Sequence, residues 1–584
     1  MKRPPNRPTS IDDAKIVPVK FTNADQGVAF SVAMDEICVK GADGAESFVT
    51  LDPPATPENY RLRIAAFSAQ GEVLPVAYPD GEERNDANRR LITRKMRVKV
   101  PADATDKVAA ANGLAISERP GYAPEWVILE AADPLAALAA VDSVRASEGV
   151  VSADVLTGRK RFTRAMPNDA LINNQWHLKN TVTSPSISHA NVEGAWNYPS
   201  TGIRGNGIRI GIVDDGLQTG HPDLSPNVDT VNGWDWNGND ADPNPSATAN
   251  ADRHGTACAG VAGARGNNSI GVSGVAPEAT LVGMRLIAGS PTDADEASAL
   301  SWKNDIIQVK SNSWGPSDYI KILDAPDPLA AAAFQNMATN GRGGKGTIFT
   351  WAAGNGGGAT YQDNSNFDGY ANSIYTIAVA ALERTGLATD YTEPGANILI
   401  TAPSGDRDTI GTTTTDRTGT AGYNTLSTPN GGDYYSSFDG TSSATPVVSG
   451  AVALMLQKNP NLGWRDVQEI LFRSATKVVP SDAGWKTNGA GFSFHHQFGG
   501  GLVNATAAVN MAEAWVNLPA QTSLVSTDSA AVAIPNNNAA GASKTFTFSQ
   551  INHRVEAVTV QLAATHSARG NLAITLTSPS GTVS

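Results

Sequence analysis

Residues 208–216 read IRIGIVDDG, in which an apolar run leads directly into two aspartates and a glycine. The run predicts a buried strand whose C-terminal end presents a carboxylate. Between residues 165 and 517, further short apolar runs alternate with helical segments. We expect strands at 279–286, 346–353, 373–380 and 396–402, and helices at 295–306, 328–339, 464–475 and after Ser442. The alternation predicts a parallel, doubly wound α/β sheet with active groups at the carboxyl ends of its strands.

Three regions flank this sheet, and the length predicts several domains. Residues 1–93 hold short alternating pieces broken by turn-forming sequences, which indicates a β-rich region of unknown role. Residues 94–164 carry the patterns of a βαββαβ unit. Residues 518–584 contain period-2 runs that favour a β-sandwich but supply too few strands to close one, so we expect a partial domain there.

The composition is that of a soluble, mildly acidic globular protein, with 44 Lys and Arg against 57 Asp and Glu and a net charge of −13. This balance excludes a nucleic-acid-binding arm. Two cysteines, Cys38 and Cys258, cannot form a disulfide framework, so the core or bound metal must hold the fold. The longest apolar stretch, 447–456, is too short and too interrupted for a membrane span. The basic N-terminus is not followed by the apolar region of an ordinary secretory signal, so we expect another export route or a start further upstream.

Distant motifs supply the groups that activate a serine. Asp214 ends the strand, RHGT places His254 forty residues later, and GTSSATP places Ser442 188 residues beyond that. A serine hydroxyl needs an imidazole to take its proton and a carboxylate to hold that imidazole in the right tautomer. In WAAGNGG, Asn355 can stabilise a developing oxyanion together with the Ser442 N–H. Each motif alone is usually a turn or a structural group, but four in a consistent order predict a catalytic site.

These residues resemble the subtilisin superfamily of serine endopeptidases, whose DxG, HGT, GTS and GN motifs occur here in the family's order. The segments VDDG, RHGT, NSWGPSD, WAAGNGG and FDGTSSATP look most like the kexin/furin branch of proprotein convertases. Asp215 could compete with Asp214 for His254, but the resemblance implies that the first aspartate is catalytic. It also implies that residues 94–164 are a propeptide-like domain and residues 518–584 a partial P domain.

The resemblance implies acidic substrate subsites. Asp318 in NSWGPSD and Asp368 in NFDGY match the acids of the primary pocket, where two carboxylates suit the forked guanidinium of an Arg side chain. Asp215 would face the second substrate side chain. The acids for the fourth would be Glu296 and Asp324. The alternative for each of these acids is a solvated loop charge.

One position departs from the family pattern. Three residues before His254 the family often has an aspartate, whereas this chain has Ala251. A preference for a basic residue at the second substrate position therefore does not follow.

The propeptide-like unit ends in a basic run that contains Arg161 and Arg164. An Arg-x-x-Arg tail is the sequence that a basic-specific pocket would cut. We therefore predict self-processing after Arg164, with the released unit acting as chaperone and inhibitor. A mature chain that began well away from Ala165 would contradict this.

Closely spaced oxygen ligands in several loops suit Ca²⁺. The resemblance implies three sites. The first comprises Asp169, Asp223 and Asn268, with carbonyls near Arg265 and Ile270; the second comprises Asp235, Asp240 and Asp242; the third comprises Asp318, Asp363 and Glu393. Such ions would stabilise a chain without cross-links. The alternative is that these are acidic turns with no ion.

Two further features favour structural roles. Cys258 lies one helical turn after His254, on the same face, and is expected to be a small buried apolar residue because Ser442 supplies the nucleophile. His495 and His496 are adjacent, and neighbouring strand residues point to opposite faces, so they do not form a metal pair.

The sequence thus predicts a calcium-dependent serine endopeptidase that is made as a zymogen and cuts protein or peptide substrates after Arg or Lys. We expect no nucleic-acid partner and no membrane span, and the resemblance implies a secreted or extracytoplasmic protein. Three alternatives stay open: the same fold with broad specificity, a non-catalytic binding protein on a protease-like scaffold, and peptide ligation through the same acyl-enzyme.

Overall fold

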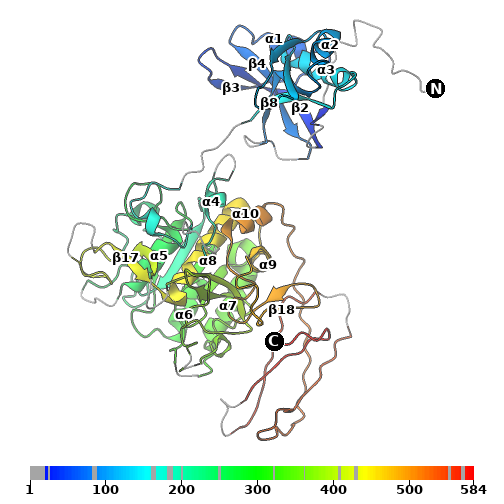
Figure 1. Cartoon of the computed structure of the whole chain (residues 1–584). Helices are drawn as coiled ribbons and strands as arrows, with labels where there is room; N and C mark the ends of the chain where they lie inside the picture. The colour runs from blue at the N-terminus through cyan, green and yellow to red at the C-terminus, as the bar shows by residue number, and fades with distance from the viewer. Residues whose placement is uncertain are drawn as a thin grey trace. The chain divides into compact units, whose positions relative to one another are not determined.

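The computed structural model describes residues 20–23, 27–81, 84, 88–159, 166–179, 188–198, 202–247, 252–319, 322–358, 360, 362–405, 410–426, 432–549, 554–566 and 572–584. The chain forms two compact units, one within residues 20–159 and the other from residue 166 onward (Figure 1). Arg161 and Arg164, at the expected processing site, lie outside the described residues, as does Ala251. Among the described residues, no helix combines the length and apolar character that crossing a membrane requires.

The N-terminal unit is built on an eight-stranded sheet in the order β1-β2-β4-β5-β7-β6, with β3 added to β2 and β8 to β5. Its strands are β1 Lys20–Asn23, β2 Val28–Lys40, β3 Glu46–Thr50, β4 Glu72–Pro79, β5 Arg90–Lys99, β6 Ala115–Glu118, β7 Trp126–Glu130 and β8 Ser152–Gly158. Its helices are α1 Tyr60–Ala65, α2 Thr105–Ala111 and α3 Pro134–Arg145. The elements from β5 to β8 follow the predicted βαββαβ order.

Strand β5 crosses the boundary that the sequence predicts between residues 93 and 94. Its N-terminal end pairs with both β4 and β8, and the rest of it pairs with β7 and β8. One hydrophobic core contains Phe30 and Ile37 from the first segment and Met96 and Leu138 from the second. Residues 28–158 are therefore one folded body, and the division at residue 93 does not separate two cores.

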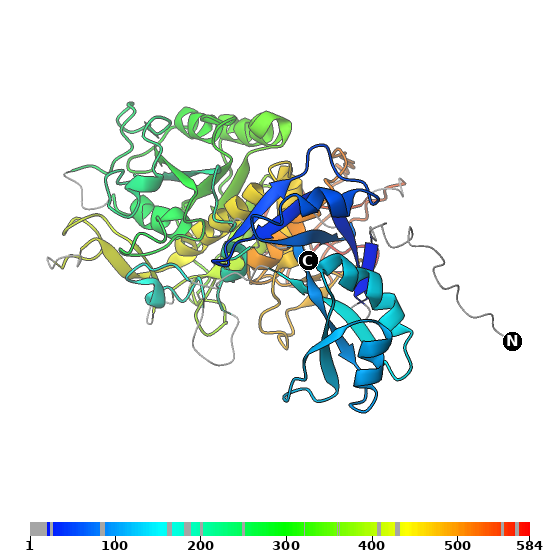
Figure 2. The same ribbon diagram turned by 90° about the horizontal axis from the view of Figure 1, so that it is seen from above.

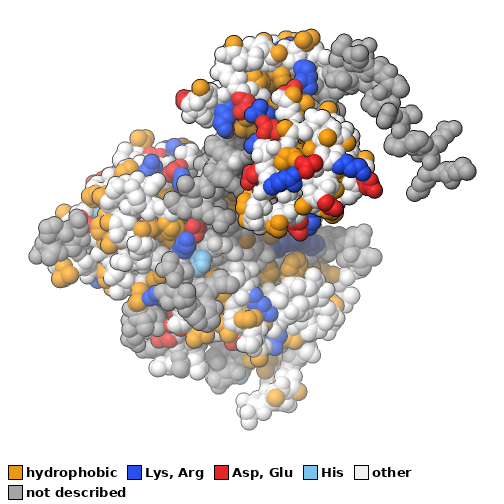
Figure 3. Space-filling view, turned by 45° about the horizontal axis from the view of Figure 1, so that its top comes forward, with side chains coloured by type: hydrophobic (Ala, Val, Ile, Leu, Met, Phe, Trp, Pro, Cys, Tyr) orange, Lys and Arg blue, Asp and Glu red, His pale blue; other side chains and the backbone are white. Residues whose placement is uncertain are grey.

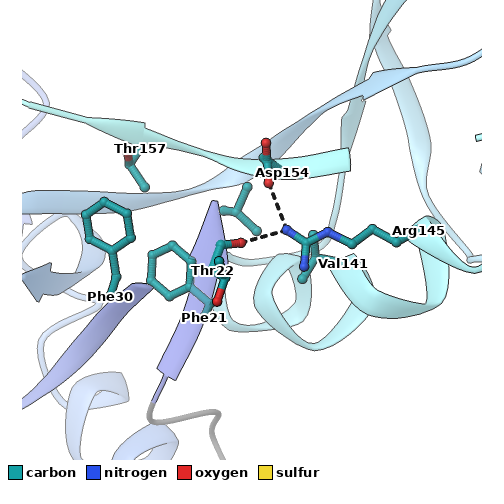
Figure 4. Close-up of a pocket in the computed structure, with 8 residues that line it drawn as sticks. Phe21, Thr22, Phe30, Val141, Arg145, Asp154 and Thr157 are labelled. Atoms are coloured by element: carbon teal, nitrogen blue, oxygen red, sulfur yellow. Dashed lines mark hydrogen bonds and ion pairs between the residues drawn. The ribbon is translucent and has the colours of Figure 1, made fainter. Parts of the chain in front are cut away.

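A small cavity shows how the first strand is held in this unit (Figure 4). Arg145 of α3 donates one hydrogen bond to the Thr22 carbonyl (2.7 Å) and another to the buried carboxylate of Asp154 on β8 (2.8 Å). Phe21 stacks on Phe30 beside them, with 5.2 Å between the ring centroids. On the face of the unit that Figure 3 shows, acidic and basic side chains are interspersed.

The second unit contains a seven-stranded parallel sheet in the order β10-β11-β9-β12-β13-β14-β15. The strands are β9 Arg209–Asp214, β10 Trp234–Asp235, β11 Thr280–Arg285, β12 Val309–Asn312, β13 Ile348–Ala352, β14 Thr376–Leu382 and β15 Ile398–Pro403. The helices are α4 Glu193–Trp196, α5 His254–Gly263, α6 Asp293–Ser301, α7 Pro328–Gly344, α8 Gly440–Lys458, α9 Trp464–Ser474 and α10 Ala505–Glu513. Two short antiparallel pairs complete the unit: β16 Thr412–Thr415 with β17 Tyr434–Phe438, and β18 Lys486–Thr487 with β19 Ser493–Phe494.

Helix α8 runs through the middle of this unit and packs on α5, α10 and strands of the sheet (Figure 2). It is buried along almost its whole length because it is rich in Ala, Ser, Gly and Val. A Cβ atom at Gly450 would lie 2.5 Å from Val275 and 3.0 Å from the Ala262 carbonyl, so glycine permits the close approach of α8 and α5. Both helices begin at the carboxyl edge of the sheet, where the sequence predicts the active groups.

The described residues after 517 contain turns and irregular segments with no helix and no strand, and an isolated bridge joins Thr577 to Val583. Two ion pairs tie this segment to α9. Arg465 binds both carboxylate oxygens of Glu556, at 2.6 and 2.7 Å, and Arg554 binds Glu469.

Candidate active site

The predicted catalytic residues lie at the starts or ends of three elements. Asp214 is the last residue of β9, His254 is the first residue of α5, and Ser442 is the third residue of α8. Strand β9 lies between β11 and β12, and α5 packs on both β9 and α8. The parallel sheet thus gathers residues that are 40 and 188 positions apart in the sequence at one edge.

Asp214 holds the imidazole of His254. The Nδ1 atom lies 2.8 Å from Oδ1 and 3.0 Å from Oδ2 of Asp214, which is buried, while His254 keeps 24% of its side chain exposed. Burial alone would lower the pKa of His254, but the neighbouring Asp214 charge outweighs it and holds this pKa well above its ordinary value. In the neutral ring, a proton on Nδ1 that is bonded to the carboxylate leaves Nε2 to act as a base.

Ser442 is held by a reciprocal pair of hydrogen bonds with Ser313. Its Oγ donates to the Ser313 carbonyl (3.2 Å), and the Ser313 Oγ donates to the Ser442 carbonyl (3.0 Å). The Cys258 sulfur lies 3.8 Å from His254 Nδ1 and 3.6 Å from the Ser442 carbonyl oxygen, so the imidazole and the serine backbone border the same thiol. Burial raises the pKa of Cys258 to about 11, which keeps it a neutral thiol.

The side chain of Asn355 is oriented by its neighbours. Its Oδ1 accepts hydrogen bonds from the backbone N–H of Thr441 (2.8 Å) and from the Thr441 hydroxyl (3.0 Å). Its own backbone N–H donates to Asp318 Oδ1 (2.9 Å), and its Nδ2 lies 3.4 Å from Asp318 Oδ2. The carbonyl side of the amide is therefore fixed, which leaves the NH₂ group as the donor that an oxyanion would need.

A cavity of about 240 Å³ joins the serine to the predicted primary-pocket acids. Its lining includes Ser442, Asn355, Asp318, Asp368 and Trp314. Asp368 is half-buried at the cavity wall and accepts a hydrogen bond from the Tyr370 N–H (2.7 Å). Burial raises the pKa of Asp368 to about 7, and the negative charges of Asp324 and Asp318 add to this effect.

The other predicted substrate acids make contacts within the protein. Both oxygens of Asp215 accept backbone N–H groups at the start of α5, from Arg253 (2.9 Å), His254 (3.0 Å) and Gly255 (2.7 Å). Burial and the adjacent Asp214 raise the pKa of Asp215 to about 6.

Glu296 accepts a hydrogen bond from the Tyr370 hydroxyl (2.6 Å), and burial raises its pKa. Asp324 forms a parallel backbone bridge with Asp368. Of the described residues, only Asp318 and Asp368 among the five predicted subsite acids line the cavity.

Two of the three candidate calcium groups contain buried carboxylates, although Asp318, Asp363 and Glu393 do not bring one oxygen each to within 4.8 Å of one another. In the first, Asp169 and Asp223 are buried near Asn268, whose Nδ2 donates to Asp223 (2.7 Å), and burial raises the pKa of Asp223 to about 6. In the third group, burial raises the pKa of Glu393 to about 8, and the charges of Asp363 and Asp318 add to this effect. Buried carboxylates that repel one another are a donor set that Ca²⁺ would relieve.

The second candidate group fits less well. Asp235 already forms an ion pair with Arg285 (2.7 Å), and it accepts a hydrogen bond from the Asn237 N–H (2.7 Å). Asp240 and Asp242 lie in the exposed turn that follows.

Sequence reasoning did not single out four residues that contact the site: Ser313, Thr441, Asp252 and Arg285. Ser313 and Thr441 lie inside the motifs NSWGPSD and GTS, so their positions next to predicted site residues could have indicated them. Arg285 ends β11, and Asp252 lies two residues before His254; only the pairing of β11 beside β9 brings them together.

Comparisons with known proteins agree with this arrangement. The subtilase family (peptidase S8) matches residues 205–501, and the proprotein convertase P-domain matches residues 555–584. A PC3-like endoprotease variant B of Hydra vulgaris is 38% identical over 436 residues, which cover 72% of this chain and 58% of that protein. Proprotein convertase subtilisin/kexin type 5 of Rattus norvegicus is 39% identical over 424 residues, covering 71% of this chain and 22% of that protein.

Among solved structures, a serine protease of Aeromonas sobria superposes with a TM-score of 0.56 at 29% identity, covering 62% of this chain and 70% of that one. The matched region covers 58% of the Hydra vulgaris protein and 22% of the Rattus norvegicus protein, so the chain spans only part of the length of these two relatives.

Proposed function

The chain belongs to the subtilase family of serine endopeptidases, and on that premise we propose that it is a calcium-dependent endopeptidase that hydrolyses peptide bonds after Arg or Lys. The observation that carries this proposal is that Ser442, Asn355, Asp318 and Asp368 line the same cavity. A nucleophile, an oxyanion donor and two carboxylates thus line one open pocket. Two carboxylates can bind both edges of a guanidinium group.

In the proposed mechanism, His254 takes the proton of Ser442 as that hydroxyl attacks the scissile carbonyl. Asp214 keeps Nδ1 protonated and stabilises the imidazolium that forms. The Asn355 amide and the Ser442 N–H stabilise the oxyanion, a contribution worth about 3 to 4 kcal/mol for each donor. His254 then returns the proton to the leaving amine, and water hydrolyses the acyl-enzyme.

Calcium, when bound, would supply structural charge compensation and no chemical step. The ligands would be Asp169, Asp223 and Asn268 in one site, and Asp318, Asp363 and Glu393 in the other. Because Asp318 also lines the cavity, the second ion would order the wall of the primary pocket. This relation supports a link between calcium and specificity.

We also propose that the N-terminal unit is a propeptide and that the chain is made as a zymogen processed after Arg164. The βαββαβ order of β5 to β8 supports this reading. An extracytoplasmic location follows from the same proposal. N-terminal sequencing of the mature chain tests it, and a start far from Ala165, or processing that persists in Ser442→Ala without added protease, would contradict it.

The deciding experiment is mass spectrometry of a mixture of Lys- and Arg-containing peptides digested with and without a chelator. Cleavage after basic residues that disappears in Ser442→Ala and weakens with chelator is the expected result. Cleavage after large apolar residues would remove the basic specificity and keep the protease. Failure of a fluorophosphonate probe to label Ser442 in mature protein would favour a non-catalytic binding protein.

A further inference from the structure

A single guanidinium group joins three segments behind the histidine. Arg285 is the last residue of β11 and is the register partner of Asp214 on β9. Its Nε donates to the Asp215 carbonyl (3.1 Å), and its two terminal nitrogens bind Asp235 and Asp252, each at 2.7 Å. Only 13% of its side chain is exposed.

Asp252 is buried and belongs to the segment that enters α5. One of its carboxylate oxygens, Oδ2, accepts both the Arg285 bond and a hydrogen bond from the Ser246 N–H (3.1 Å). Two residues later the chain reaches His254. The backbone of His254 is bound by Asp215, and its ring is bound by Asp214.

Three contacts therefore define where the imidazole lies. Asp214 fixes the orientation of the ring, and Asp215 fixes the backbone at the start of α5. Arg285 fixes the segment that precedes α5 through its ion pair with Asp252. Arg285 also donates a hydrogen bond to the carbonyl of Asp215, so it acts on two of the segments that position His254. A planar fork with donors in fixed directions can serve three acceptors at once, whereas the point charge of a lysine cannot reproduce that geometry.

We propose that Arg285 is a positioning residue of the reaction, which holds the imidazole of His254 in place through Asp252 and the Asp215 backbone. This inference rests on the proposed endopeptidase function. It means that Arg285 affects kcat although its side chain contacts neither the substrate nor Ser442. The role depends on the shape of the guanidinium group and not on its charge alone.

The test compares Arg285→Lys, Asp252→Asn and the double variant as full chains. Arg209→Lys is the matched control, because Arg209 lies on the neighbouring strand β9 and is ion-paired with Asp229 (3.0 Å) at the opposite end of the sheet. Each sample is first titrated with a fluorophosphonate, so that kcat is expressed per reactive Ser442. Melting temperature is recorded beside kcat and KM on one peptide with Arg before the cleaved bond.

We expect Arg285→Lys to lower kcat per titrated site by about 10- to 100-fold with little change in KM, as a small displacement of a catalytic group does. Asp252→Asn should give a loss of similar size. The double variant should be no slower than the worse single variant, because both changes break one link. Arg209→Lys should keep the wild-type kcat.

Three results would overturn the inference. One is a wild-type kcat in Arg285→Lys, even at a lower melting temperature, since this would make Arg285 purely structural. Another is multiplicative losses in the double variant, and the last is an equal loss in Arg209→Lys. A wild-type chain that is neither labelled nor active would refute the proposed function instead, and so the two failures are distinguishable.

Discussion

Two groups of acids in the region of the site differ in the groups that bind or surround their carboxylates. The histidine-side acids are Asp214, Asp215 and Asp252. They are bound, respectively, by the His254 ring, by the N–H groups that begin α5, and by the Arg285 guanidinium. The cavity acids are Asp318, Asp363, Asp368 and Glu393, and the charges that act on the last two are those of other carboxylates.

The difference teaches that one protein can use the same side chain in two ways. An acid that is bound by an imidazole, a guanidinium or several N–H groups at once serves as a fixed support, even where, as at Asp215, a neighbouring acid raises its pKa. An acid that is buried among other acids has a raised pKa and would gain most from a cation that comes from outside. We therefore assign positioning to the histidine-side acids and cation recognition to the cavity acids.

The variant with the largest expected effect on this contrast is Asp214→Asn. The amide would favour the wrong tautomer of His254 and would not stabilise the imidazolium, so kcat should fall by about 10⁴-fold with KM little changed. Steady-state kinetics on a peptide substrate measures this. A fall of less than tenfold would mean that Asp214 is not the orienting acid.

Asp368→Asn tests the cavity acids. The asparagine keeps an oxygen for the Tyr370 N–H but removes the charge, so kcat/KM for a substrate with Arg before the cleaved bond should fall by about 10²- to 10³-fold. Fluorophosphonate labelling of Ser442 should stay unchanged. Asp305→Asn, at an exposed acid, is the control, and an unchanged preference for Arg in Asp368→Asn would remove Asp368 from the pocket.

The pH dependence of stability tests Glu393. Its folded pKa of about 8 lies above the ordinary 4.5, so without calcium its contribution is fully present below pH 4.5 and is lost as the pH rises to about 8. We expect the free energy of unfolding in chelator to fall by about 2 to 4 kcal/mol across this window. Glu393→Gln should flatten that slope, whereas Glu278→Gln should not.

Calcium should reverse this trend, because the ligand is the ionised carboxylate. The gain in melting temperature on adding calcium should therefore increase with pH. Equal gains at pH 5 and pH 8 would contradict a site at Glu393.

The smallest expected effect is that of Asp215→Asn. The asparagine retains one neutral acceptor for the N–H groups that begin α5, so we expect a loss of about 1 kcal/mol in the free energy of unfolding. The preference for Arg before the cleaved bond should not change. Denaturant unfolding beside a peptide-library digest checks both, and a lost preference for a basic second side chain would show that Asp215 faces substrate.

The sequence predicts much of this fold because most strands of the parallel sheet are buried apolar runs with helices between them. It does not predict β12, whose residues Val309–Asn312 include Lys310, Ser311 and Asn312. Lys310 is fully buried there, and its Nζ atom donates to the carbonyls of Ala299 and Leu300 at the end of α6. Polar side chains in a central strand find their hydrogen-bond partners only in the tertiary structure, so no local sequence pattern reveals such a strand.

The candidate site also contains residues that the sequence predicts and residues that only the fold reveals. Motif order predicts that Asp214 and His254 act together, and the structure places them in hydrogen-bond contact. Asp215 is expected to face the substrate, but its carboxylate meets the N–H groups of α5. Arg285 was not predicted, because its role depends on β11 lying beside β9, and that neighbour relation cannot be read from either strand alone.

Strand β5 has a consequence for the cooperativity of the N-terminal unit. Its strand pairing reaches β4 before residue 93, β7 after it, and β8 on both sides of it. A fragment that began at residue 94 would lose Ile92 from the shared core and leave β4 without this partner. Amide protons in β4 and β7 should therefore exchange with solvent through the same global opening, at equal free energies.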